Sequence, residues 1–418
     1  MKILIISQYF WPENFRINDL VAGLVERGHE VSVLTGIPNY PEGSFYSGYG
    51  ILGPYSENFS GATVKRVPMT PRGKQKALFL ALNYLSFSTF ACLWSLFRCR
   101  DKYDAVFVWC MSPVTVTLSG LVIKGIRGIP VYNWIADLWP DTLRAAGTLR
   151  PGRIMSLVGK LSSFIYRKCD LNLIASEGYR SRLIEMGVEP EKITYWPFWA
   201  EAVYSEPLDV EKTVPISEIT GFKLLFAGNI GRMQGFDTIV KAAEILKDKG
   251  DIHWIILGDG SEKAWLEQEA RARGLGDNFH FLGRCPIEDV RYYAAEADAM
   301  LVSLRKDPLF AITVPGKLQS CMALGRPIIA SIDGEAADII HASKGGRVAQ
   351  ADDAEALADA VLSIECLSSE ERSQMGRNAR AYFMDNFERE KLFSKLEVIL
   401  SGTNRDGWTP DAHEARDH

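Results

Sequence analysis

A glycine-rich loop with one arginine is the first feature that could do chemistry. The sequence GNIGRMQG at residues 228–235 follows an apolar stretch and precedes a helical pattern at 236–249. Glycines let backbone N–H groups approach an anion, and a helix start adds N–H groups that point the same way. Arg232 would then supply a positive charge suited to a phosphate. An ordinary strand-to-helix turn with a surface arginine would give the same pattern, so the loop alone leaves both interpretations open.

A second loop places a lysine at an unfavourable position. The sequence TVPGKLQS at residues 313–320 opens a predicted helix, with Lys317 in its first turn. The helix dipole disfavours a cation there by a few tenths of a kcal/mol. An anion bound at the same helix start would remove this penalty, because dipole and ammonium then both attract it. A phosphate-binding role is therefore favoured over a solvated lysine.

An acidic motif, DLWPD at residues 137–141, follows an apolar stretch at 130–135. Ligands of open parallel sheets bind beyond the carboxyl ends of the strands, which is where Asp137 would lie. Its carboxylate could orient or deprotonate an acceptor hydroxyl group. Asp141 better fits a structural role as a helix N-cap, and the segment at 11–16 should face the same edge. The candidates for the acceptor side are Glu13, Asn14, Arg16 and Asp141.

Parallel sheets must position these residues, and the apolar pattern predicts two of them. Short apolar stretches alternate with helical periodicity, which is typical of a parallel sheet covered on both faces. After a turn-rich stretch at 197–215, interpreted as a linker, the alternation starts again. Strands are expected at 3–6, 31–34, 63–67, 105–108, 130–135 and 171–174, and then at 223–226, 252–257, 279–282, 300–303 and 327–330.

Size and composition narrow the class of protein. The chain has 418 residues and is 47% apolar, which is more than one core usually fills, so two domains are expected. The net charge of −5 and the absence of long Lys/Arg runs argue against a nucleic-acid partner. Seven scattered cysteines without a C-x-x-C pair are typical of reduced thiols in a cytosolic protein. The first apolar run is too short for a signal peptide.

One uncharged segment, Ala77–Phe97, complicates this assignment. As a helix its 21 residues would extend about 30 Å, the thickness of a bilayer core. Polar residues interrupt it, basic residues flank both ends, and a spanning helix would divide the predicted sheet. A helix lying in the membrane interface is therefore favoured over a spanning one. A core helix of the first domain fits the sequence equally well.

An ordered set of motifs carries a family resemblance. They are RGHEV at 27–31, PNYP at 38–41, DLWPD at 137–141, GNIGR at 228–232, GDG at 258–260, FLGR at 281–284 and PGK at 315–317. No motif is decisive alone, but their order is specific and the match extends from residue 1 to about 401. Together they resemble retaining glycosyltransferase family four. The similar branch acts in O-antigen, capsule and colanic-acid synthesis and includes L-fucosamine transferases.

The resemblance implies an α/β protein of GT-B fold, with two doubly wound Rossmann-like domains facing across a cleft. The implied boundaries are 1–200 for an acceptor-binding domain and 215–385 for a nucleotide-sugar-binding domain. A helix at 386–402 would pack back on the first domain, and a polar tail would follow at 403–418. The protein would be cytoplasmic and peripheral to the inner membrane, with 77–97 as the membrane-associating segment.

The implied reaction moves a sugar from a UDP-linked donor to a lipid-linked saccharide carried on undecaprenyl diphosphate, with retention at the anomeric carbon. An N-acetylated deoxyhexosamine such as L-FucNAc is one candidate sugar. Arg232 and Lys317 would neutralise the leaving diphosphate, so no metal or cofactor is expected. Asp137 stands at the catalytic-site position of the first domain, where the family often has histidine.

The implied donor site departs from the family pattern at two positions. Gln234 stands where many relatives have lysine, and Ser320 stands where a glutamate binds ribose, with Ile312 at the position of its paired glutamate. Ribose recognition would then pass to Gln319 or to other residues. The implied donor-binding residues are Gly228, Asn229, Gly231, Gln234, Gly258, Asp259, Gly260, Arg284, Pro315, Gly316, Gln319 and Ser320.

Two other functions stay open on the same residues. A UDP-sugar epimerase of this fold would bind the same donor without a sugar acceptor. A non-catalytic nucleotide-sugar-binding protein fits the departures at Gln234 and Ser320. An NAD-dependent oxidoreductase fits less well, because the loop at 7–12 has no G-x-G-x-x-G motif.

Overall fold

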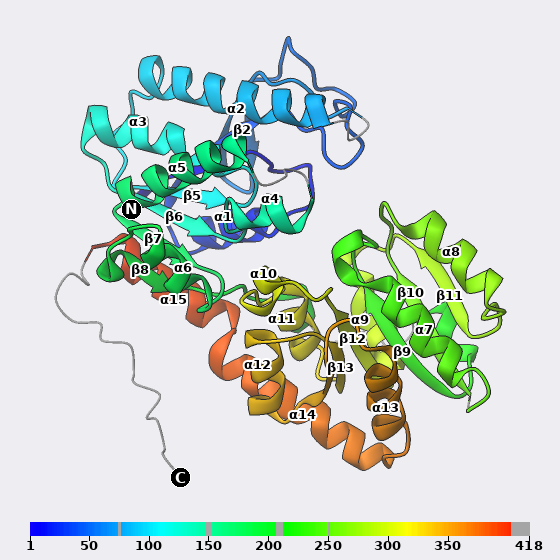
Figure 1. Ribbon diagram of the computed structural model, residues 1–418. Coiled ribbons are helices and arrows are strands. Elements are labelled where there is room, and N and C mark those ends of the chain that lie inside the picture. The colour runs from blue at the N-terminus through cyan, green and yellow to red at the C-terminus, as the bar shows by residue number, and fades with distance from the viewer. Residues whose placement is uncertain (74–76, 148–151, 206–211, 250, 403–418) are drawn as a thin grey trace.

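The computed structural model describes residues 1–73, 77–147, 152–205, 212–249 and 251–402, and within them two sheets follow each other along the chain (Figure 1). The strands of the first are β1 (Lys2–Ile6), β2 (Glu30–Gly36), β3 (Ser56–Phe59), β4 (Ala62–Val67), β5 (Ala105–Cys110), β6 (Val131–Ile135), β7 (Leu171–Ile174) and β8 (Ile193–Tyr195). Those of the second are β9 (Phe222–Ala227), β10 (Ile252–Leu257), β11 (Phe279–Gly283), β12 (Ala299–Ser303), β13 (Ile328–Ser331) and β14 (Gly346–Ala349).

The first sheet has the order β3-β4-β2-β1-β5-β6-β7-β8. Its pairs are parallel apart from the β3–β4 pair at one edge. Strands β5 and β6 are buried at every position, as expected for strands covered on both faces. Because β1 pairs with both β2 and β5, the strand order reverses at β1, and the loops that follow these strands separate to leave room for a ligand.

Helices cover both faces of the first sheet. They are α1 (Arg16–Glu26), α2 (Ala77–Phe97), α3 (Thr117–Arg127), α4 (Asp141–Ala145), α5 (Arg153–Lys168) and α6 (Tyr179–Glu185), with short 3-10 turns η1 (Val114–Val116), η2 (Pro190–Lys192) and η3 (Ala202–Ser205). Phe87 of α2, Ile123 of α3 and Ile165 of α5 share one core with Leu4 and Val106 of the sheet. The helices α2, α3 and α5 therefore form a single layer, and α1 covers the opposite face.

The second sheet is parallel, with the order β11-β10-β9-β12-β13-β14. Its helices are α7 (Phe236–Leu246), α8 (Lys263–Ala272), α9 (Ile287–Glu296), α10 (Pro308–Ala311), α11 (Gly316–Ala323), α12 (Glu335–Ser343), α13 (Ala354–Glu365) and α14 (Ser369–Asn386), with 3-10 turns η4 (Pro215–Glu218) and η5 (Arg232–Gln234). Two apolar clusters lie on the two sides of this sheet. The helix α7 shares one of them with α13, and α11 shares the other with α12 and α14.

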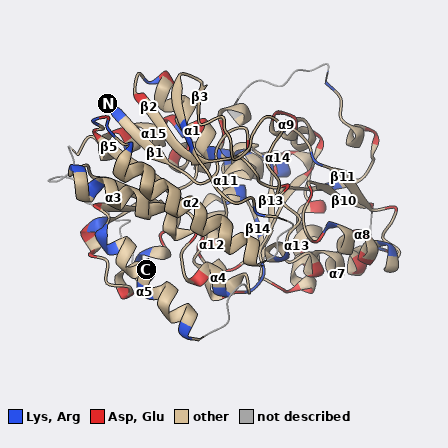
Figure 2. Ribbon diagram, turned by 90° about the horizontal axis from the view of Figure 1, so that it is seen from above, with Lys and Arg blue, Asp and Glu red and all other residues tan. Residues whose placement is uncertain are grey.

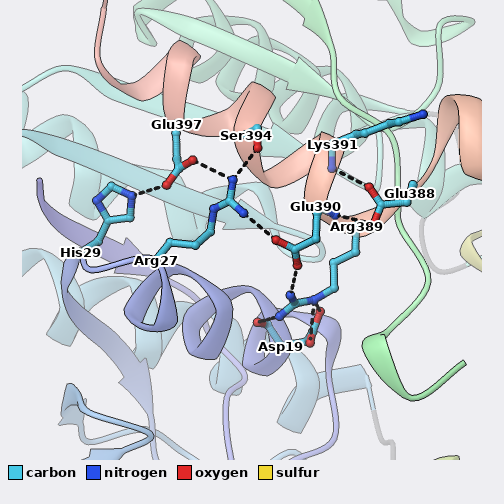
Figure 3. Close-up of polar contacts among 9 residues, drawn as sticks. All are labelled: Asp19, Arg27, His29, Glu388, Arg389, Glu390, Lys391, Ser394 and Glu397. Atoms are coloured by element: carbon cyan, nitrogen blue, oxygen red, sulfur yellow. Dashed lines mark hydrogen bonds and ion pairs between the residues drawn. The ribbon is translucent and has the colours of Figure 1, made fainter. Parts of the chain in front are cut away.

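The last helix, α15 (Arg389–Leu400), returns to the first domain and packs beside α1 (Figures 1 and 3). The Nε atom of Arg389 donates to Asp19 at 2.9 Å, and Arg27 reaches Glu397 at 2.9 Å. A Cβ atom on Gly23 would lie 2.3 Å from the Phe393 ring, so the absence of a side chain there permits the close approach of the two helices. The chain thus crosses between the domains twice.

The expected fold class, two Rossmann-like domains, is confirmed, and the predicted strands match observed ones. The pattern missed β3, β8 and β14. The β3 sequence, SENF, alternates exposed and partly buried positions and contains no apolar run. The predicted tail at 403–418, part of the predicted linker at 206–211 and the basic flank at 74–76 lie outside the described residues.

Candidate active site

A cavity of about 1310 Å³ lies between the two domains. The loops that follow β9, β10, β11 and β12 form the second-domain wall, so the carboxyl ends of neighbouring parallel strands meet there. The first-domain wall includes Pro12, Asn14, Tyr40, Pro41, Tyr46, Arg72 and Leu80. The second-domain wall includes Gly228, Asn229, Gly231, Arg232, Gly258, Asp259, Gly260, Arg284, Arg305 and Lys306.

The glycines of this wall are required by loop packing. A Cβ atom on Gly258 would lie 1.8 Å from the carbonyl oxygen of Gly228, and one on Gly260 would lie 2.2 Å from that of Ile230. Gly258 also has a φ of +153°, which strains any other residue. The two loops after β9 and β10 can therefore lie against each other only with glycine at these positions.

Arg232 lies on the cavity wall with its side chain exposed. Its backbone is fixed by Arg305, whose Nε donates to the Arg232 carbonyl at 2.7 Å and whose Nη2 donates to Asp237 at 2.8 Å. Gln234 accepts the N–H of Gly231 through Oε1 at 3.1 Å. The side chain of Gln234 thus stabilises the loop, while Arg232 is left to face the cavity.

Lys317 is the most unusual residue near this wall. Its Nζ atom is buried 3.2 Å from the centroid of the Phe226 ring, and among the described residues it has no hydrogen-bond partner. A Cβ atom on Gly228 would lie 3.0 Å from Nζ. Burial lowers the pKa of Lys317 to about 7, because the desolvated charged form is disfavoured. The amine therefore lies directly behind a glycine that lines the cavity.

Asp137 follows β6 as predicted and is held by a neighbouring strand end. Its Oδ2 accepts a hydrogen bond from Ser112 Oγ at 2.7 Å, and Trp139 Nε1 donates to the same hydroxyl at 3.0 Å. Burial raises the pKa of the Asp137 carboxyl, and the Ser112 hydrogen bond partly opposes this shift. Asp137 is not among the residues that line the cavity; it lies two residues beyond the carboxyl end of β6.

The four acceptor-side candidates separate in the structure. Asn14 lines the cavity. Glu13 is 1% exposed and accepts the backbone N–H groups of Phe10, Asn39 and Tyr40. Burial raises its pKa to about 7, although these hydrogen bonds oppose the shift. Glu13 therefore organises the loops of this wall.

Arg16 and Asp141 make ion pairs and lie outside the cavity wall. Arg16 extends from α1 to the second domain, where Nη2 donates to Gly316 O at 2.9 Å and to Ser320 Oγ at 2.6 Å. Its Nε pairs with Glu201 at 2.9 Å. Asp141 opens α4 and pairs with Arg182 at 3.1 Å, without making a cap hydrogen bond. Arg16 thus ties the two domains together at the start of α11.

The two residues considered for ribose binding are used elsewhere. Ser320 accepts from Arg16, and Gln319 is completely buried. With its amide oriented to donate, Gln319 lies 3.0 Å from Pro315 O and 3.3 Å from Gly316 O. Neither residue lines the cavity, and neither do Pro315 and Gly316.

The cavity residues that sequence reasoning missed include three cations, Arg72, Arg305 and Lys306. Arg305 and Lys306 follow β12 directly, so the rule that ligands bind at strand carboxyl ends could have found them. No motif or strand end in the sequence indicated Arg72. Its Nη1 donates to Tyr9 OH at 2.7 Å, and its guanidinium stacks 5.0 Å from the Tyr40 ring centroid. Distant loops place this cation on the first-domain wall.

Ion pairs also join the domains beside the cavity. Arg284 on the second-domain wall pairs with Asp259 at 3.1 Å and with Glu42 of the first domain at 3.2 Å. Within the described part of the chain, no group of three or more His, Cys, Asp or Glu residues is arranged to hold a metal ion.

Two family models match most of the chain. The model described as "Glycosyl transferase 4-like domain" matches residues 14–199, and "Glycosyl transferases group 1" matches residues 211–382. The chain is 27% identical over 341 residues to the "Putative colanic acid biosynthesis glycosyl transferase WcaI" of Escherichia coli (strain K12), covering 78% of this chain and 82% of that protein.

Further relatives agree with these models. The chain is 26% identical to the "Probable glycosyltransferase WbjE" of Pseudomonas aeruginosa, over 56% of this chain and 59% of that one. The structure of Anabaena Alr3699/HepE in complex with UDP superposes with a TM-score of 0.67 at 15% identity, over 96% of this chain and 100% of that one, and it supports the fold alone. The chain therefore belongs to the glycosyltransferases of GT-B fold, with a glycosyl transferase 4-like domain followed by a group 1 domain.

Proposed function

We propose that this glycosyltransferase moves a sugar from a UDP-linked donor to a lipid-linked glycan during synthesis of a bacterial surface polysaccharide. The observation that carries the proposal is the buried amine of Lys317 behind Gly228, on the loop that also presents Arg232 to the cavity. The name of the WcaI relative supports the polysaccharide pathway, and the UDP complex of HepE supports the nucleotide. A deoxyhexosamine such as L-FucNAc is the proposed sugar.

In the proposed chemistry, the second domain binds the diphosphate of the donor and the first domain binds the acceptor. Negative charge develops on the diphosphate as its bond to the anomeric carbon breaks, and Arg232 and Lys317 stabilise that charge without a metal. Asp137 orients the acceptor hydroxyl or takes its proton, and the raised pKa of its carboxyl suits it to this role. The new glycosidic bond keeps the anomeric configuration.

A thermal-shift screen tests the donor assignment. UDP and UDP-sugars are expected to raise Tm more than GDP or dTDP compounds, because at equal concentration the ligand with the lower Kd stabilises the native state more. A ligand present at 100 times its Kd stabilises that state by about 2.7 kcal/mol. UDP release with EDTA present should then require a lipid-linked acceptor. Release that needs no acceptor would indicate epimerisation or hydrolysis. An absence of turnover with every donor and acceptor would indicate a binding protein.

The affinity for UDP should fall as the pH rises above 7. In the protein without UDP, the pKa of Lys317 is about 7. A bound diphosphate raises this pKa, so above pH 7 the lysine must take up a proton when UDP binds. Affinity is therefore complete below pH 7 and is lost above it, by up to about tenfold per pH unit. Calorimetric titration of UDP between pH 7 and 9, in wild type and in Lys317→Met, measures this slope. A slope that persists in Lys317→Met would assign it to another group.

A further inference from the structure

The helix α2 exposes many apolar side chains and buries several polar ones. Its buried side includes Asn83, Ser88 and Ser95 beside Phe87 and Ala91, whereas most of its leucines and the other phenylalanines are exposed. Leu78 is 68% exposed and Leu85 is 60% exposed. Other exposed members are Phe79, Leu82, Phe90, Leu93, Leu96 and Phe97. So many exposed apolar side chains on one helix mark a surface that binds another protein or a membrane.

The neighbouring helices extend this apolar surface. The helix α3 packs against both α2 and α5, and all three cover the same side of the first sheet. Leu157 of α5 is 68% exposed, Phe164 is 51% exposed and Ile126 of α3 is 50% exposed. We call the outer surface of α2, α3 and α5 the three-helix face.

The three-helix face is also free of acidic residues. None of the three helices contains Asp or Glu, although the whole chain carries a net charge of −5. Figure 2 shows these helices in tan and blue. Exposed cations lie among the apolar residues of α5, and none has an ion-pair partner among the described residues. They are Arg153, Lys160, Arg167 and Lys168.

We propose that the three-helix face binds the surface of an anionic lipid bilayer, with α2 parallel to the bilayer plane. Leucines and phenylalanines would enter the acyl boundary while the α5 cations contact lipid phosphates, which is the pattern of an interfacial helix. A second copy of the chain fits the same face poorly, because two cationic surfaces would repel each other. Charge complementarity therefore favours the bilayer.

The packing of α2 distinguishes surface binding from spanning. By length and composition α2 could cross a membrane, a test that core helices of soluble proteins also pass. However, Gln8 Nε2 donates to Asn83 Oδ1 at 2.7 Å, and Ser88 Oγ donates to Thr115 at 2.8 Å. Phe87 is completely buried in the first-domain core. A spanning α2 would break these contacts, whereas interfacial binding retains them.

The three-helix face also reaches the cavity. Leu80, near the start of α2, lines the cavity together with Arg72. A protein bound through this face would hold the cavity mouth beside the bilayer, where the headgroup of a lipid-linked acceptor lies. This consequence rests on the proposed function, whereas binding of the face to lipid does not.

Vesicle co-sedimentation of the full chain tests the proposal. Wild type should bind vesicles of phosphatidylcholine with phosphatidylglycerol, bind pure phosphatidylcholine more weakly, and be released by salt or alkaline carbonate. The pair Leu85→Glu and Leu157→Glu should abolish binding. The pair Lys160→Ala and Arg167→Ala should lower partitioning onto the anionic vesicles by about 25-fold, since each cation contributes about fivefold.

Matched controls separate this result from misfolding. Ile245→Glu and Met384→Glu alter exposed apolar residues of the second domain and should bind vesicles as wild type does. The UDP thermal shift of each variant reports folding and donor binding independently. Vesicle binding without sugar transfer would refute the proposed function and leave the three-helix face supported.

Three results would overturn the proposal. In the first, the Lys160→Ala and Arg167→Ala pair binds vesicles as well as wild type does, and alkaline carbonate does not release the bound protein. This result would indicate a spanning α2. Another is an absence of vesicle binding by wild type. In the third, wild type forms a dimer and does not bind vesicles, and the Leu85→Glu and Leu157→Glu pair converts that dimer to monomers.

Discussion

Replacing Lys317 with methionine is expected to weaken UDP binding while making the free protein more stable. A hydrogen bond to a charged group contributes about 1.5–3 kcal/mol, or roughly 10- to 150-fold in affinity. In the free protein, however, the buried Nζ atom has no hydrogen-bond partner among the described residues and lies against the Phe226 ring. Removing such an unsatisfied group at similar volume should stabilise the fold by about 1–3 kcal/mol.

Calorimetric titration with UDP and thermal unfolding without ligand measure the two effects in one variant. Lys241 is an exposed lysine of α7, and Lys241→Met should change neither quantity. Gly228→Ala provides a second check, because its Cβ atom would lie 3.0 Å from Nζ and displace the amine. A Lys317→Met protein that is less stable and still binds UDP normally would show that the lysine is structural.

Asp137→Asn is expected to lower turnover on the order of 10²-fold or more while leaving UDP affinity unchanged. Asparagine keeps the shape and can still accept from Ser112, but it cannot take a proton, and general base catalysis typically contributes about 10²–10⁴-fold. Initial rates at saturating donor, together with UDP titrations, separate turnover from binding.

Asp141→Asn is the matched control, since it alters a carboxylate in the same motif that pairs with Arg182. Its turnover should stay within a few-fold of wild type. Ser112→Ala removes the donor to Asp137 and should shift the pH dependence of turnover toward a higher pKa. Equal losses in Asp137→Asn and Asp141→Asn would mean that the whole motif acts through folding.

The sequence predicted the two-domain fold because that fold depends on local patterns. Strands such as β5 and β6 are continuous apolar runs, and a parallel sheet covered on both faces requires such runs. The glycine-rich loop singled out Arg232, and the family resemblance implied the loop at 258–260; both line the cavity, and their role in donor binding stays a prediction. These features need no knowledge of which elements become neighbours.

Lys317 shows what the sequence by itself determined and what only the tertiary structure decided. Its position in the first turn of α11 follows from the order Pro315, Gly316, Lys317, and so does the conflict with the helix dipole. The direction of its side chain depends on Phe226 of β9 and on Gly228, which are distant in sequence. The same holds for Arg72 beside Tyr9 and Tyr40. Burial and the pairing of charges arise from contacts between distant segments, and local sequence does not encode those contacts.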